Sequence, residues 1–349
     1  MRHAARVRAL VFETFGGPLT VQDVPAPDPA PGGVVVRVGA SGVCRSDWHA
    51  WKGHDDSVAL PHVPGHEFAG VVTAVGPAVT RVTVGDRVTA PFIFACGTCD
   101  ECLAGATHVC SRQQQPGFTL PGSYAEALVS PYADVNVIVL PDAVGFAAAA
   151  ALGCRFGTAY HALHARARVQ AGEWVAVFGC GGVGLSAVAV AIAAGARVVA
   201  TDISPAALER AAALGANVVT MDEGAVDEVR ALTGGGAHIA LDAYGSRATS
   251  LASVAALRAR GRHVQVGLLL GDEAAPVIPM GRVIADELEL LGSHGISVGE
   301  YAAMIADVVA GRLRPEESIG RTIGFDELPG ALAGMDLPVT TAGMMVAVF

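Results

Sequence analysis

The segment VAVFGCGGVGLSAVAVAIAAGARVVATD, residues 175–202, decides the fold of the central part of the chain. Its first residues form a short apolar run that predicts a strand, its alanine-rich middle predicts a helix, and its end predicts a second strand that stops at Asp202. The turn between the first strand and the helix contains four glycines, Gly179, Gly181, Gly182 and Gly184. This order of elements predicts two parallel strands joined through a helix.

The glycine turn is suited to binding a dinucleotide. Glycine lets the backbone approach a pyrophosphate, whose charge is favoured by the amino end of the following helix, and an acidic residue after the second strand accepts from ribose hydroxyls. Asp202 would repel a 2′-phosphate, and the residues that follow it, ISPAA, offer no arginine or lysine to receive one. We therefore predict NAD in preference to NADP. The alternative role for Asp202 is a cap for the helix expected near Ser204.

The two halves of the chain differ in pattern. In the first half, glycine, proline and short β-branched runs such as GVVVRVGA predict an all-β or mixed domain. From about Gly172, short apolar strands alternate with helical segments such as SPAALERAAALGA, which indicates a parallel sheet covered on both faces. After Leu291 the pattern predicts one more helix and a final strand in GMMVAVF. We expect an α/β protein with domain boundaries near residues 152 and 290.

The composition narrows the class of protein. The 349 residues are enough for two domains, and the formal net charge of −10 argues against a nucleic-acid partner. The start of the chain lacks the apolar run of a signal peptide and no run is long enough to span a bilayer, so we expect a cytoplasmic protein with no membrane partner. In a reducing compartment, clustered cysteines are better suited to holding metal than to forming disulfides.

Four of the seven cysteines lie within the segment CGTCDECLAGATHVC: Cys96, Cys99, Cys102 and Cys110. Four thiolates form a closed tetrahedral site with no position left for chemistry, so the spacing predicts a structural zinc. The metal would supply the cross-links that the sparse apolar residues of this loop cannot provide. An iron–sulfur cluster is the alternative occupant for the same ligands.

Three further potential ligands are scattered along the chain: Cys44 in GVCRSDWH, His66 in PGHEFAG and Cys154 in GCRFGTAYHAL. Each one alone is equally consistent with an ordinary core residue. Together, two thiolates and one imidazole leave a zinc ion with an open fourth position, which is the arrangement of a catalytic site. The remaining cysteine, Cys180, is interpreted as a packing residue.

Taken together, these motifs show that the chain resembles the zinc-dependent medium-chain alcohol dehydrogenases from end to end. The matching pieces occur in the family's order and spacing: GVCRSDWH, PGHEFAG, VGDRV, CGTCDECLAGATHVC, GCRFGTAYHAL and GCGGVG. The resemblance implies a GroES-like β-barrel catalytic domain built from residues 1–152 and 290–349. It also implies a Rossmann coenzyme domain with a doubly wound parallel sheet, residues 153–289, inserted between the two parts, with the active site in the cleft.

The resemblance implies roles for the potential metal ligands. Cys44, His66 and Cys154 would bind the catalytic zinc, and the four clustered cysteines would bind the structural zinc. Glu67 would be an auxiliary carboxylate at the catalytic zinc, although it is also consistent with an ordinary salt-bridge partner. Asp47 would orient the imidazole of His66, as metal-bound histidines generally require.

Other positions match the coenzyme and proton-transfer residues of the family. Ser46 and His49 resemble the hydroxyl and the imidazole of a proton relay. Arg45 matches a residue that contacts the coenzyme pyrophosphate, and Thr158 and Val183 match positions beside the nicotinamide. The simpler interpretations are a turn residue for Ser46 and a surface histidine for His49.

The implied reaction is reversible hydride transfer between a primary or secondary alcohol and NAD, with two zinc ions per chain. The partner would be a small alcohol, aldehyde or ketone, and the protein would be a homo-oligomer, with a tetramer favoured over a dimer. Phe92, Trp48 and Trp51 suggest an apolar wall that favours hydrocarbon or aromatic substrates. A polyol or formaldehyde-type dehydrogenase is the enzymatic alternative, although polyol enzymes often have glutamate in place of Cys154. An NAD-binding regulatory protein is the non-enzymatic alternative.

Overall fold

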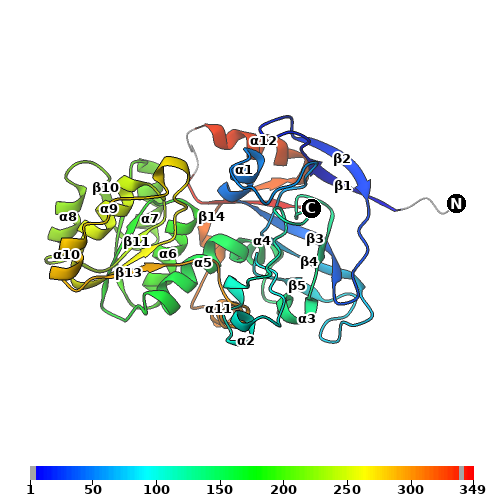
Figure 1. Cartoon of the computed structure of the whole chain (residues 1–349), viewed down its shortest axis with the longest axis horizontal. Helices are drawn as coiled ribbons and strands as arrows, with labels where there is room; N and C mark the ends of the chain where they lie inside the picture. Colours follow the sequence, from blue (N-terminus) through cyan, green and yellow to red (C-terminus); the bar gives the residue numbers. More distant parts are fainter. Residues whose placement is uncertain (1–4, 338–341) are drawn as a thin grey trace.

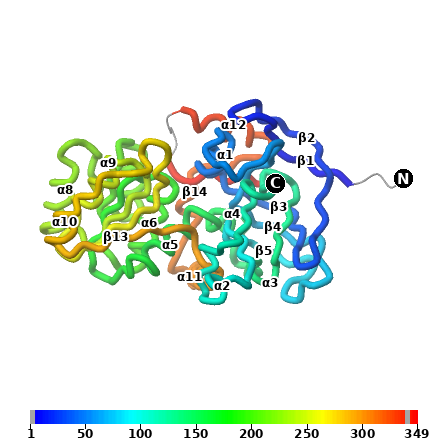
Figure 2. The backbone as a smooth tube through the Cα atoms, in the orientation of Figure 1, coloured from blue at the N-terminus to red at the C-terminus, as the bar shows by residue number. Residues whose placement is uncertain are grey.

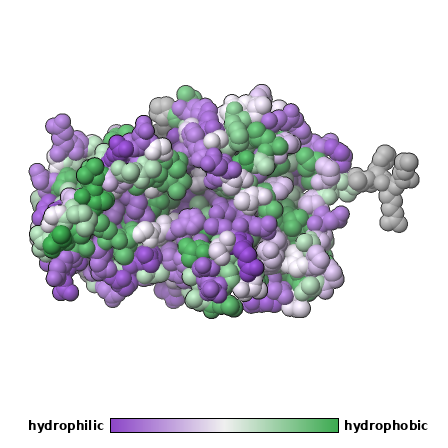
Figure 3. Space-filling view, viewed as in Figure 1, coloured by the Kyte–Doolittle hydropathy of each residue, from purple (hydrophilic) through white to green (hydrophobic). Residues whose placement is uncertain are grey.

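The computed structural model describes residues 5–337 and 342–349, which form two lobes (Figure 1). The left-hand lobe comes from the middle of the chain, whereas the right-hand lobe is built from both ends, as the backbone trace in Figure 2 shows. Among the described residues, no helix has both the length and the apolar character needed to cross a membrane. On the visible face, hydrophilic and hydrophobic residues are mixed over both lobes (Figure 3).

The left-hand lobe contains a six-stranded parallel sheet in the order β10-β9-β8-β11-β12-β13. The chain enters at β8 in the middle of the sheet, builds outward to one side and then crosses to the other, so the sheet is doubly wound. In such sheets ligands bind outside the carboxyl ends of the strands, where the direction of winding changes. The strands are β8 (Trp174–Phe178), β9 (Arg197–Asp202), β10 (Asn217–Thr220), β11 (Ala237–Asp242), β12 (Leu257–Gln265) and β13 (Glu289–Gly292).

Helices cover this sheet and begin where the sequence signals them. Helix α6 follows the glycine turn directly and is buried along most of its length, which explains its apolar composition. Helix α7 begins after Ser204, whose hydroxyl accepts from the N–H of Ala207, and has proline at its first position. The helices are α6 (Gly182–Ala193), α7 (Pro205–Ala213), α8 (Ala225–Leu232), α9 (Arg247–Ala255) and α10 (Met280–Ala285).

The right-hand lobe contains a seven-stranded mixed sheet and a separate β1-β2 hairpin. The sheet order is β14-β15-β3-β4-β5-β7, with β6 also paired to β3. Strand β15, near the end of the chain, pairs antiparallel with β3, so segments from both halves of the chain share one sheet. The strands are β1 (Arg6–Val11), β2 (Thr20–Pro25), β3 (Val34–Val43), β4 (Phe68–Val75), β5 (Arg87–Thr89), β6 (Ala127–Ser130), β7 (Ile138–Val139), β14 (Ile319–Gly324) and β15 (Met344–Val348).

The helices of the right-hand lobe are short apart from α11. They are α1 (Arg45–Trp51), α2 (Asp100–Leu103), α3 (Ala133–Asn136), α4 (Phe146–Ala151), α11 (Val298–Val309) and α12 (Leu328–Ala333). Single turns of 3₁₀-helix occur throughout the chain at η1 (Thr107–Val109), η4 (Gly271–Glu273), η5 (Pro315–Ser318), η6 (Phe325–Glu327) and η7 (Gly334–Asp336).

A continuous helical segment from Phe146 to Arg166 joins the two lobes. It runs from α4 through the π-helical turn η2 (Leu152–Phe156) and helix α5 (Gly157–His161) to a second π-helical turn, η3 (Ala162–Arg166). The largest apolar core packs around this segment and the parallel sheet. Because π-helical turns occur frequently at functional sites, the position of Cys154 within η2 is consistent with the role predicted for it.

The structure contains the elements that the sequence pattern predicts in the second half of the chain. The parallel strands, helix α7 and the final strand β15 all lie where expected. Helix α11 starts later than the predicted segment, at Val298, because Ser297 and Glu300 form a capping box there. The domain limits of 1–152, 153–289 and 290–349 stay a prediction.

Candidate metal centres and coenzyme site

Three potential ligands from distant segments meet between the lobes. Cys44 caps helix α1 directly after β3, His66 precedes β4, and Cys154 lies in the turn η2. Their ligand atoms and a carboxylate oxygen of Glu67 all lie within 4.8 Å of one another. The Nε2 atom of His66 is buried and has no hydrogen-bond partner in the part of the chain that the structure describes. A buried nitrogen facing two thiols fits a bound zinc ion, which takes both ligand types.

Asp47 fixes the orientation of the His66 ring. Its Oδ1 atom lies 2.7 Å from Nδ1 of His66 and also accepts from the N–H of Gly65 at 2.9 Å. Its Oδ2 atom accepts from the hydroxyl of Tyr124 at 2.8 Å and from the N–H of Cys44 at 3.2 Å. Since Asp47 is fully buried, these four contacts hold the carboxylate rigidly and direct Nε2 of His66 toward the thiols.

The two thiols interact with each other. A hydrogen bond from Cys154 lowers the pKa of Cys44 well below its usual value. The same contact, together with burial, raises the pKa of Cys154. The contact favours a thiolate on Cys44 and a thiol on Cys154. A divalent cation bound by both sulfurs would displace the remaining proton.

Glu67 is paired with Arg155, a residue that the sequence analysis did not single out. The Oε2 atom of Glu67 lies 2.5 Å from Nη2 of Arg155, and Oε1 accepts from the N–H of Arg155 at 2.9 Å. Burial raises the pKa of the Glu67 carboxyl, and the Arg155 guanidinium opposes this rise. The salt-bridge interpretation of Glu67 therefore describes the observed contact, and the auxiliary ligand role stays a prediction.

Two glycines leave room for the ion pair between Glu67 and Arg155. A Cβ atom at Gly42 would lie 1.9 Å from Oε2 of Glu67, and one at Gly182 would lie 2.5 Å from Cδ of Arg155. Arg155 therefore extends from the glycine turn to the carboxylate beside the catalytic cluster. The sequence gives little indication that Arg155 lies at this site, apart from its position next to Cys154.

The sulfur atoms of the four clustered cysteines all lie within 4.8 Å of one another. The sulfur of Cys99 lies 3.4 Å from that of Cys102 and 3.6 Å from that of Cys110. These distances exclude disulfides, whose S–S length is about 2.05 Å. They approach the separation of about 3.8 Å expected for thiolates at about 2.3 Å from a tetrahedral zinc. The N–H of Thr98 lowers the pKa of the Cys96 thiol to about 5, which favours the thiolate form that binds metal.

The glycine turn has the geometry that a close approach to a ligand requires. Gly179 has a φ of +92°, and a Cβ at Gly184 would lie 1.8 Å from the carbonyl oxygen of Gly179, so both positions require glycine. Asp202 accepts from the N–H of Cys180 at 2.6 Å and from the N–H of Ser204 at 2.8 Å. Because Ser204 itself caps helix α7, Asp202 is not the helix cap. It lies instead at the carboxyl end of β9, beside the turn.

The remaining predicted residues lie on helices that begin beside the metal-ligand cluster or the glycine turn. Thr158 is buried in α5, and Val183 is the second residue of α6. Ser46 and His49 are on α1, directly after Cys44. The Arg45 guanidinium lies 4.1 Å from the centroid of the Trp48 ring and donates to the carbonyl of Met335. The coenzyme and relay contacts of these residues stay predictions.

Two aromatic rings lie beside the imidazole of His66, where the sequence suggests an apolar wall. Phe92 and Phe118 lie edge-on to the ring of His66, with centroid distances of 5.8 and 5.5 Å. Trp51, the last residue of α1, is buried, and its indole N–H donates to the carbonyl of Gly17 at 2.9 Å. The place of Trp51 in the wall stays a prediction.

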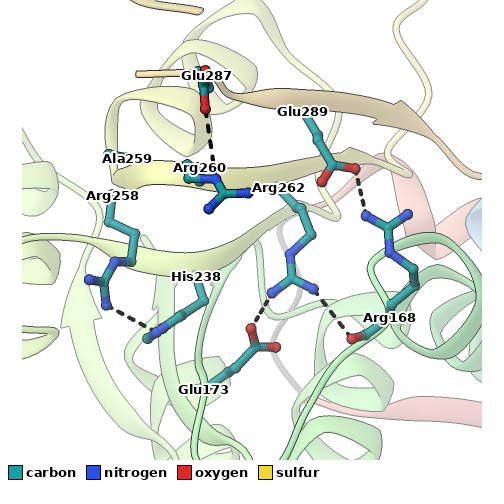
Figure 4. Close-up of a pocket in the computed structure, with 9 residues that line it drawn as sticks. All are labelled: Arg168, Glu173, His238, Arg258, Ala259, Arg260, Arg262, Glu287 and Glu289. Atoms are coloured by element: carbon teal, nitrogen blue, oxygen red, sulfur yellow. Dashed lines mark hydrogen bonds and ion pairs between the residues drawn. The ribbon is translucent and has the colours of Figure 1, made fainter. Parts of the chain in front are cut away.

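A polar cavity of about 470 Å³ lies elsewhere, at the amino ends of the parallel strands (Figure 4). Ion pairs cross it: Arg168 lies 2.6 Å from Glu289, and Arg262 contacts Glu173. Among the described residues, none of the predicted ligands or coenzyme contacts lines it. Since coenzymes bind at the carboxyl ends of parallel strands, this cavity is not the coenzyme site.

Comparison with known proteins agrees with this geometry. The chain is 39% identical over 293 residues to an alcohol dehydrogenase of Geobacillus stearothermophilus, a match that covers 82% of this chain and 84% of the relative. The chain belongs to the zinc-dependent medium-chain alcohol dehydrogenase family. Residues 30–142 of this dehydrogenase match the model of the alcohol dehydrogenase GroES-like domain, and residues 182–310 match that of the zinc-binding dehydrogenases.

Solved structures resemble the dehydrogenase over its whole length. Alcohol dehydrogenase TADH from Thermus sp. ATN1 has a TM-score of 0.90 and 33% identity, with 98% of this chain and 99% of that chain covered. A cobalt- and zinc-bound thermostable alcohol dehydrogenase from Pyrobaculum aerophilum has a TM-score of 0.86 and 29% identity, with 99% and 100% covered. These matches confirm the predicted family, the α/β fold with GroES-like and Rossmann-type domains, and the function as a zinc-dependent alcohol dehydrogenase.

Proposed function

We propose that this dehydrogenase transfers hydride between a primary or secondary alcohol and NAD at a zinc ion held by Cys44, His66 and Cys154. The convergence of these three ligands, with the Nε2 atom of His66 buried and unpartnered among the described residues, is the observation that supports the proposal most directly. A related structure is described as cobalt and zinc bound, which is consistent with this assignment.

A zinc ion held at this site would supply Lewis-acid chemistry and would lower the pKa of a bound hydroxyl group, as zinc lowers the pKa of bound water to about 7. The residues around it handle the proton and orient the reactants. Ser46 would accept the proton of the substrate hydroxyl at Oγ while its own hydroxyl proton passes to His49, which delivers it onward. Burial lowers the pKa of His49, followed by the charge of His54, so the imidazole readily gives up a proton near neutral pH. Thr158 and Val183 position the nicotinamide ring.

We propose an apolar substrate class because the aromatic rings of Phe92 and Phe118 flank His66. Initial rates with NAD should be measured over a panel of aliphatic and aromatic alcohols together with polyols. We expect kcat/KM for the hydrophobic alcohols to exceed that for polyols by about 10-fold or more, since each buried methylene contributes about 1–3 kcal/mol to discrimination. A preference for polyols would contradict the proposal.

The coenzyme preference for NAD is proposed to depend on Asp202. Replacing Asp202 by Gly and Ile203 by Arg should raise the NADP/NAD ratio of kcat/KM by about 10- to 100-fold, because hydrogen bonds to a charged group contribute about 1.5–3 kcal/mol. Ile203 suits this change because its side chain is exposed. Ile203→Arg alone is the control, since it keeps the carboxylate and should remain selective for NAD. An unchanged ratio in the double variant would show that Asp202 does not read the ribose.

The four clustered cysteines are proposed to hold a second, structural zinc, so that each chain carries two ions. All seven cysteines are free, which is consistent with the proposed cytoplasmic location.

Strand β13 ends the parallel sheet and has no further strand beside it among the described residues, so its edge is available for pairing between subunits. We therefore propose a homo-oligomer, with a tetramer favoured over a dimer.

A further inference from the structure

A hydrogen bond links His49 to His54, a residue outside the predicted proton relay. The two Nδ1 atoms lie 2.9 Å apart, and the ring centroids are separated by 5.2 Å. The N–H of His54 also donates to the carbonyl of His49 at 3.0 Å. Both rings lie edge-on to Trp48, at centroid distances of 4.9 and 5.5 Å. The indole and the backbone therefore hold the two imidazoles in register.

The two histidines differ in exposure to solvent. His49 is half-buried on α1, whereas His54 is exposed beyond the end of that helix. Burial lowers the pKa of His49, and a positive charge on His54 lowers it further. Burial therefore disfavours a lasting proton on His49, and the pair leads from a half-buried ring to an exposed one.

The contact between two Nδ1 atoms sets how protons move through the pair. Only one of these atoms carries the shared proton, so one imidazole donates and the other accepts. When His49 receives a proton at Nε2, it can release its Nδ1 proton to Nδ1 of His54. His54 then loses its own Nε2 proton to water or buffer. Each imidazole has then gained one proton and lost one. The remaining hydrogen of each ring is now on the other ring nitrogen, so both rings must return to their first tautomer before the next transfer.

The charged groups around the pair favour release of the proton. The Arg45 guanidinium and the Lys52 ammonium group lie 4.1 and 5.6 Å from the centroid of Trp48, on which both histidines pack. Two carboxylates near the pair, those of Asp336 and Asp55, already have partners. Asp336 binds Lys52 at 2.8 Å and the indole N–H of Trp48 at 2.7 Å, and Asp55 binds the hydroxyl of Ser57 at 2.6 Å. The Arg45 guanidinium is one of the charges that lower the pKa of His49, after burial and the charge of His54.

We propose that His54 is a proton-transfer residue that acts through His49 and delivers the substrate proton to solvent. The inference rests on the proposed function, because it assumes that His49 receives the proton that an alcohol loses. In the opposite direction, His54 would collect a proton from solvent for carbonyl reduction. The sequence offers little signal for this role, since His54 lies outside every motif that matches the family.

The test measures proton release in the zinc-loaded enzyme with NAD and alcohol, using a pH-indicator dye in stopped flow at low buffer concentration. His54→Asn keeps a hydrogen-bonding group near Nδ1 of His49 but cannot relay a proton. We expect this variant to release protons about 10-fold more slowly than the wild type, a smaller loss than the roughly 10²–10⁴-fold that a general acid or base contributes, because water can partly replace an exposed imidazole. Added free imidazole should restore the rate. His238→Asn, in the other lobe, is the matched control and should behave as the wild type.

The outcomes separate this inference from the proposed function. If His49→Asn slows proton release while His54→Asn does not, the role of His54 is wrong and the relay stands. If His49→Asn has no effect, the relay itself fails and His54 with it. A slow His54→Asn variant that free imidazole does not restore would reduce His54 to a structural residue and overturn the inference. If His49→Asn, His54→Asn and the variant with both substitutions all slow proton release by the same factor, the two histidines act in one shared pathway.

Discussion

Replacing Arg155 by leucine is expected to destabilise the dehydrogenase by about 3–5 kcal/mol, because it leaves the buried Glu67 carboxylate without its cation. Glu67 has no exposed surface, and the pair is joined by contacts of 2.5, 3.1 and 3.2 Å between guanidinium and carboxylate. Urea unfolding of the zinc-loaded protein, followed by circular dichroism, measures the change in free energy. This is a larger effect than we expect from any surface pair in the molecule.

The matched control for Arg155→Leu removes the charge of its partner as well. In the double variant Arg155→Leu with Glu67→Gln, the amide oxygen still accepts from the N–H groups of Cys154 and Arg155, and no unpaired charge is buried. We expect this variant to recover most of the lost stability. If the two substitutions instead destabilise the protein additively, the ion pair does not carry the interaction that the structure indicates.

Cys44→Ala should lower kcat for alcohol oxidation by about 10³-fold or more. Loss of one of three ligands weakens the only group at the site that lowers the pKa of a hydroxyl, and removing a single electrostatic contact to a reacting oxygen already costs about 10²–10³-fold in other enzymes. The fold and NADH binding should be retained, because the glycine turn and Asp202 lie on other elements. Steady-state oxidation and fluorescence titration with NADH measure the two quantities. Full turnover in this variant would contradict the assignment of Cys44.

Local sequence patterns predicted the parts of the molecule that local geometry determines. The segment 175–202 shows the strand, turn and helix directly, because the glycines at Gly179 and Gly184 are required by backbone geometry. The four clustered cysteines lie within one short loop, so their spacing alone brings the sulfurs together. The scattered ligands Cys44, His66 and Cys154 are different, because only the complete fold brings them together. Their common site was predicted from the resemblance to the family.

Residues whose partners are remote in sequence were missed. Arg155 pairs with Glu67 across 88 positions, and Tyr124 reaches Asp47 across 77, so no periodicity or spacing connects them. His54 is closer to His49, but only the turn after α1 brings the two Nδ1 atoms together.

Zinc content per chain, measured by mass spectrometry on the purified wild type and on Cys44→Ala and Cys102→Ser, tests the central claim that Cys44, His66 and Cys154 hold one ion and the four clustered cysteines another. Two ions in the wild type and one in Cys44→Ala are predicted, with the remaining ion showing only sulfur neighbours in X-ray absorption. Cys102→Ser should lose the all-sulfur signature and retain mixed nitrogen and sulfur neighbours. Two ions in Cys44→Ala, with nitrogen still among the neighbours, would contradict the account.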